Sequence, residues 1–157
     1  MLLNARLYSA KEENELADRA YDKLVQKLLL VPTEIKDQLP QLRYVSGLAD
    51  YMMGNLENAQ NQLKLYLSQN KNDINTMAIL ADIAVRQNQP EQVIELLEGK
   101  LSLIQSDLNL SLTLCRQYVA NKRPYKCEVF LSELRKVHTD KVALNLMQVQ
   151  ECIFSNL

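Results

Sequence analysis

The chain has 157 residues, a length suited to one domain or to one compact array of small units. Its apolar fraction of 47% and charged fraction of 24% are ordinary for a soluble globular protein. A formal net charge of −1, a single His and no Trp argue against a nucleic-acid partner, His-based catalysis and a metal site with several His ligands.

Residues 1–39 are expected to form the N-terminal helices. Between residues 10 and 30, apolar residues recur on one helical stripe that ends before Pro32: Leu16, Ala20, Leu24 and Leu28. Whether residues 2–11 form a separate helix or the start of one long helix stays open, because no Gly or Pro marks a turn between them and this stripe.

Three pairs of helices follow, each with apolar residues at helical spacing. We expect them over residues 40–53 and 56–68, 74–87 and 90–101, and 107–119 and 124–137. A last helix is expected from Thr139 and Asp140 through Phe154, as a cap on the array. No strand pattern is visible, so the predicted fold class is all-α.

Punctuating residues support these boundaries. Asp73 and Asp107 stand where an N-cap is expected, and Gly54 stands in a turn. Three prolines suit the first turn of a helix, where no backbone donor is needed: Pro40, Pro90 and Pro124.

The sequence matches itself at an offset of 34 residues. Small residues coincide at Gly47, Ala81 and Cys115. Large apolar residues coincide at Leu63, Leu97 and Leu131, and the turn residue Gly54 falls on Asn88. Agreement of small, large and turn positions at one offset indicates an internal repeat of two helices.

A 34-residue repeat of two helices resembles the tetratricopeptide repeat. The resemblance covers about residues 40–139 and divides them into repeats over 40–73, 74–107 and 108–141. It implies a right-handed α-solenoid of antiparallel helix pairs, with residues 140–157 as a capping helix. In that family, small residues of the paired helices face one another, here Gly47 with Ala59, Ala81 with Val93 and Cys115 with Cys127.

The sequence departs from the family pattern at two places in each repeat. The closing proline is replaced by Lys71, Gln105 and Thr139, and a late small residue is replaced by Tyr66, Lys100 and Leu134. In the N-terminal segment, Ala20, Leu24 and Pro32 stand at the family's spacing, so that segment is interpreted as a degenerate first repeat.

The resemblance implies a binding surface, because the first helices of such pairs line a concave groove. Aromatic residues, Met and Arg are enriched at interface cores. The groove residues expected here are Tyr44, Leu48, Tyr51, Met52, Asp82, Arg86 and Arg116. The implied function is a non-catalytic scaffold that binds a partner protein or peptide.

Two alternatives to that groove stay open. Tyr44, Tyr51 and Met52 are equally explained by ordinary packing against the N-terminal helices. The chain could also be a self-assembly module, either a homo-oligomer or a segment of a longer array.

No group of residues points to chemistry. His138 is the only imidazole, and its position near a helix end suits interaction with the C-terminal carbonyl groups. Glu95 and Glu98 lie three apart without a nearby His or Cys to complete a metal site. We therefore expect no enzyme activity, no cofactor and no metal.

Cys115 and Cys127 have three interpretations at the close approach of paired helices. They are small buried apolar groups, or they form a disulfide in an oxidising compartment, or one is a reactive thiol. Cys152, on the last helix, is expected to be unpaired.

A narrower resemblance, over about residues 16–98, is to bacterial repeat lipoproteins of the PEP-CTERM/exosortase surface-sorting system. It implies an envelope scaffold linked to exopolysaccharide or surface-protein export. No apolar run is long enough to span a membrane, and residues 1–6 do not begin a signal peptide. The compartment therefore stays open between the periplasm or envelope and the cytoplasm.

Overall fold

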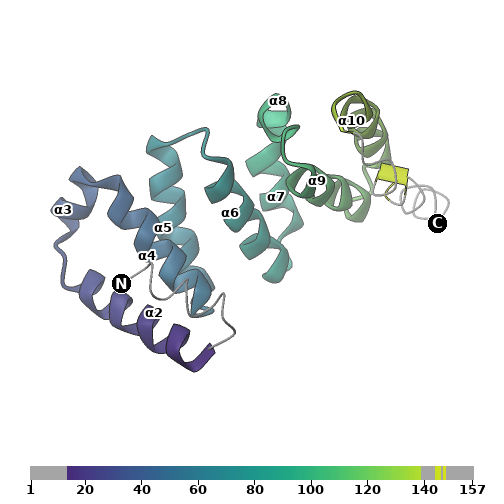
Figure 1. The fold of residues 1–157 in the computed structure, drawn as a ribbon. Coiled ribbons are helices and arrows are strands. Elements are labelled where there is room, and N and C mark those ends of the chain that lie inside the picture. Colours follow the sequence, from purple (N-terminus) through teal and green to yellow (C-terminus); the bar gives the residue numbers. More distant parts are fainter. Residues whose placement is uncertain (1–13, 139–143, 146, 148–157) are drawn as a thin grey trace. The chain divides into compact units, whose positions relative to one another are not determined.

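The structure is a computed structural model that describes residues 14–138, 144, 145 and 147. Every regular element in those residues is helical and none is a strand, which confirms the all-α class (Figure 1). The possible helix over 2–11 and Cys152 lie outside the described residues, and so does most of the expected C-terminal helix. The chain divides into two compact units, Met1–Ile83 and Ala84–Leu157, and the solenoid arrangement stays a prediction.

The N-terminal unit is built on a cluster between its first helices. Helix α2 (Asn14–Leu29) contacts α4 (Pro40–Met52), and a short helix α3 (Thr33–Gln38) connects them. The buried side chains of the cluster come from both helices: Tyr21, Leu24 and Leu28 from α2 and Ala49 from α4. Leu16, although on the predicted stripe, is 44% exposed, so the buried face of α2 begins about one turn later.

Helices α4 and α5 (Leu56–Gln69) pack closely because Gly47 has no side chain. A Cβ placed on Gly47 would lie 2.6 Å from Leu63 Cγ and 3.2 Å from the Ala59 carbonyl oxygen. Ala59 and Leu63 are fully buried. The expected pairing of Gly47 with Ala59 is thus confirmed within this unit.

Helix α6 (Ile74–Arg86) begins at the predicted N-cap and crosses the boundary between the units. The Asp73 carboxylate accepts hydrogen bonds from the Asn75 N–H at 3.1 Å and from Thr76 Oγ1 at 2.8 Å. Ala81 and Val93 are both buried but belong to different units, so their pairing stays a prediction.

In the C-terminal unit, the helix expected over residues 90–101 is divided into three pieces. These are α7 (Pro90–Leu97), a 3₁₀ turn η1 (Glu98–Lys100) and α8 (Leu101–Ile104). The division falls at Gly99, whose backbone freedom disfavours a continuous helix.

The last described pair of long helices is α9 (Leu108–Ala120) and α10 (Pro124–Val137), which contact each other (Figure 1). The Asp107 side chain caps α9 by accepting from the Leu110 N–H at 3.0 Å. The predicted starts at Pro40, Pro90 and Pro124 are confirmed as well.

Helices α4, α6 and α9 each end in a turn of the same type, and these turns are 34 residues apart in the sequence. One residue in each turn has a positive φ: Gly54 (80°), Asn88 (54°) and Lys122 (55°). The next residue returns its N–H to the carbonyl five positions back, in each case at 2.8 Å: Asn55 to Asp50, Gln89 to Ala84, and Arg123 to Tyr118. This is the Schellman pattern of helix termination, and it supports the repeat at the level of the backbone.

The close approach of α4 and α5 predicts that Gly47→Ala lowers the free energy of unfolding by about 1–3 kcal/mol, because the new methyl group displaces Leu63. Gly99→Ala is the matched control, since a Cβ there meets no atom within 4 Å. It should be neutral or stabilise by up to about 1 kcal/mol. Chemical denaturation measures both, and equal midpoints for the two variants would contradict the packing.

The left-handed turns predict the opposite effect at Lys122. Lys122→Gly should raise the free energy of unfolding by about 1 kcal/mol, because Gly adopts a φ of 55° without the steric cost of a Cβ. Lys64→Gly, inside α5, should instead lower it by about 1 kcal/mol. Thermal unfolding of the pair tests this, and destabilisation by both variants would argue against the left-handed turn.

Candidate binding surface

Helix α4 carries four of the residues predicted for the groove. Met52 is 40% exposed, and Tyr44 and Tyr51 are partly buried. Leu48 is only 9% exposed, so it belongs to the core of the unit rather than to its surface. The accessible part of the predicted surface on α4 therefore consists of one exposed methionine and two partly buried tyrosines.

A hydrogen bond joins this surface on α4 to α6, which is the first helix of the next predicted pair. The Tyr51 hydroxyl donates to Asp82 Oδ2 at 2.7 Å, across 31 positions in the sequence. Both residues lie in the N-terminal unit, Tyr51 on α4 and Asp82 on α6. Two residues predicted from separate repeats are thus brought into contact.

Tyr66 extends the surface, although the sequence reasoning gave it no role. Its ring packs against that of Tyr44 with centroids 5.1 Å apart and planes tilted by 45°. In the sequence, Tyr66 stands out only as a departure from the family's small residue. A large aromatic residue where a small one is usual was the available signal.

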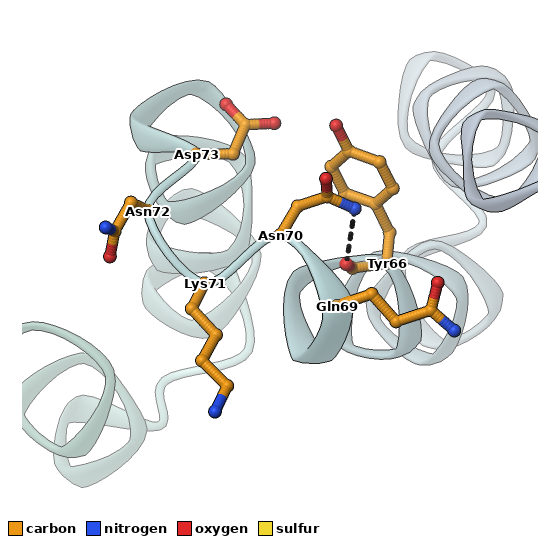
Figure 2. A pocket seen from close by; sticks show the side chains of 6 residues that line it. All are labelled: Tyr66, Gln69, Asn70, Lys71, Asn72 and Asp73. Atoms are coloured by element: carbon orange, nitrogen blue, oxygen red, sulfur yellow. Dashed lines mark hydrogen bonds between the residues drawn. The ribbon is translucent and has the colours of Figure 1, made fainter.

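A polar hollow of about 440 Å³ lies where the chain passes from α5 to α6. It is lined by Tyr66, Gln69, Asn70, Lys71, Asn72 and Asp73 (Figure 2). The Asn70 side-chain amide donates to the Tyr66 carbonyl oxygen at 3.2 Å. Burial raises the pKa of the Tyr66 hydroxyl, and the nearby Asp73 carboxylate raises it further.

Asp50, which precedes Tyr51 in α4, carries a buried carboxyl group. It is 5% exposed, and Asn55 Nδ2 donates to its Oδ1 at 3.4 Å. Burial raises the pKa of this carboxyl, and neither the Asn55 bond nor the charge of Lys36 restores its usual value.

Arg86 and Arg116 are the two predicted groove residues of the C-terminal unit. Both are exposed, Arg86 in the last turn of α6 and Arg116 on α9. They belong to a different unit from the tyrosines, so a single groove formed by all seven residues stays a prediction.

The structure brings Cys115 and Cys127 together, one on α9 and one on α10. Both are free thiols with no exposed surface. A hydrogen bond with the Cys127 thiol, together with burial, raises the pKa of Cys115. A raised pKa disfavours the thiolate, so this pair suits packing better than nucleophilic chemistry.

A charged contact connects η1 to α9 and α10 in the C-terminal unit. Glu98 binds the Lys126 ammonium, which also lies 5.9 Å from the centre of the Tyr118 ring. The hydrogen bond from Lys126 lowers the pKa of Glu98. Burial, with the charge of Glu98 beside it, raises the pKa of Tyr118 to about 12.

A second contact in this unit accounts for the only histidine of the sequence. His138 Nε2 hydrogen-bonds to the Gln105 carbonyl oxygen and thereby ties the end of α10 to the start of the α8–α9 turn. The acceptor belongs to the end of α8, whereas the sequence indicated an interaction with the carbonyl groups at the end of the helix that precedes His138.

Among the described residues, no group of three or more His, Cys, Asp or Glu side chains is placed to hold a metal ion. The described helices also include none with the length and apolar character needed to cross a membrane. Comparison of the chain with family models, with curated proteins and with solved structures gives no match.

The raised pKa of Asp50 predicts a pH dependence of stability. The folded state holds this proton more tightly than the unfolded state, whose carboxyl has the ordinary pKa of 3.8. The contribution to stability is therefore full below that value and is lost as pH rises through the raised pKa. Asp50→Asn should raise the free energy of unfolding at pH 7 and remove this dependence.

Urea denaturation of wild type and Asp50→Asn between pH 3.5 and pH 7 measures the effect. Asp22→Asn on the exposed face of α2 serves as the control and should change stability by no more than about 0.5 kcal/mol at any pH. A destabilised Asp50→Asn variant at pH 7 would show that the ionised carboxylate is favoured by its surroundings.

Proposed function

We propose that the chain is a non-catalytic scaffold that binds a partner peptide or domain on the surface formed by α4 and α6 in the N-terminal unit. The observation that carries the proposal is the hydrogen bond between Tyr51 and Asp82. It joins consecutive first helices through the side chains that the repeat pattern assigned to a shared binding surface.

The chemistry of this surface supports the proposal. Tyr51 and Met52 are neighbours on α4, and both residue types are enriched at the centres of protein interfaces. The hydrogen bond to Asp82 holds the Tyr51 ring in place before a partner arrives. Binding then costs less side-chain entropy than it would with a freely rotating ring.

A second candidate function, self-assembly, is favoured by exposed apolar residues on α10. Tyr125, Val129 and Val137 are 74%, 47% and 56% exposed. Light scattering of the purified chain separates the two functions. A mass near 18.1 kDa favours the scaffold, and a multiple of that mass favours assembly.

The direct test is affinity capture with the immobilised chain, followed by titration of the captured partner against variants. Replacing Tyr51 and Met52 together by Ala should weaken binding about tenfold or more, because anchor residues at interface centres cost at least about 1.4 kcal/mol on truncation.

The matched control replaces Tyr125 and Val129 on α10 by Ala, since this pair likewise combines a tyrosine with an apolar side chain on one helix and both residues are exposed. It should leave the affinity unchanged. Met52→Glu changes the surface but keeps the Tyr51–Asp82 hydrogen bond, so it separates a loss of binding from a loss of structure. Thermal unfolding of each variant also checks for misfolding. Equal affinities for the α4 and α10 double variants would overturn the proposal.

A further inference from the structure

The polar hollow between α5 and α6 adjoins the proposed binding surface. Tyr66 lines it, and the same ring packs against Tyr44 of α4. A partner lying across α4 would therefore meet the hollow next to the two tyrosines. Its volume of about 440 Å³ is large enough for one long side chain.

One wall of the hollow is a carboxylate held in a fixed orientation. Asp73 accepts from the Asn75 N–H and from Thr76 Oγ1. Both donors are neutral groups. They orient the carboxylate without cancelling its negative charge.

Two further features favour a positive charge. The faces of the paired Tyr44 and Tyr66 rings carry the negative part of the aromatic quadrupole. The carbonyl end of α5 also borders the hollow, and the last turn of this 14-residue helix has no basic residue to meet the negative end of its dipole.

From this arrangement we infer that the hollow receives the arginine or lysine side chain of the partner, between the Tyr66 ring and the Asp73 carboxylate. The inference rests on the proposed function, because it names the chemistry of the partner at the edge of the same surface.

Lys71 makes the inference sharply testable, because it is the cation that the chain itself contributes to the lining. Figure 2 shows its side chain extending away from Asp73 and Tyr66. A bound cation is repelled by Lys71, whereas a bound anion is attracted by it. Lys71→Gln therefore strengthens binding of a cation and weakens binding of an anion.

The experiment is an NMR titration of the full chain with a capped Gly-Arg-Gly peptide. Its neutral control has citrulline in place of Arg, and its anionic control has Glu. We expect saturable shifts at Tyr66, Asn70 and Asp73 with the Arg peptide only. Asp73→Asn retains an N-cap residue but loses the charge, and it should weaken binding about threefold or more.

Lys71→Gln should tighten binding of the Arg peptide about twofold. Three results would overturn the inference: equal shifts with the citrulline peptide, binding of the Glu peptide that Lys71→Gln abolishes, or no saturable shift with any peptide. The first indicates a neutral ligand, the second an anion, and the third that the hollow takes no side chain of this kind.

The same variants separate the inference from the proposed function. If the captured partner loses affinity with the Tyr51 and Met52 double variant but not with Asp73→Asn, the binding surface stands and the cation hollow fails. If neither variant changes the affinity of the partner, both proposals fail. Loss of affinity with both variants supports the two together.

Discussion

A residue in the left-handed backbone conformation is a common way to end a helix where the chain reverses direction. This chain uses it three times, at Gly54, Asn88 and Lys122. In each turn, a backbone N–H beyond the helix end pairs with a carbonyl group of the helix that has just ended. The spacing of these turns fixes the length of each first helix and the point where its successor starts.

After the chain reverses, the helices on either side of the turn can pack together only if their backbones can approach closely. In the N-terminal unit the approach depends on Gly47, which leaves room for Leu63 and for the backbone of Ala59. In the C-terminal unit the small residues are Cys115 and Cys127, which are buried against each other. With the small residues facing inward, larger side chains of the same helices, such as Tyr51 and Met52, lie partly on the surface.

Much of this local structure could be predicted because it is encoded by single residues with strong local preferences. Aspartate is strongly preferred as an N-cap, as at Asp73 and Asp107. Proline is strongly preferred in the first turn of a helix, where three prolines of this chain stand. Helix α3 was missed because its six residues are too few to display a helical period. The left-handed Lys122 was missed because lysine has no preference for that conformation.

The binding surface was predictable only in part. Helical periodicity placed Tyr44, Tyr51 and Asp82 on first helices, but it also placed Leu48 among them, and the surrounding core buries that side chain. The hollow beside Tyr66 was not predictable, because it forms from a loop whose shape depends on how α5 ends and α6 begins. Local sequence patterns specify helices, whereas the shape of hollows on the surface depends on tertiary packing.

One turn geometry recurs every 34 residues and ends the helices α4, α6 and α9. Amide hydrogen exchange tests it most directly at Asn55, Gln89 and Arg123, the three donors that close the turns. The account predicts that all three amides exchange more slowly than unprotected amides in the same sequence context. Exchange of any one of them at the unprotected rate, while the other two stay protected, would contradict it.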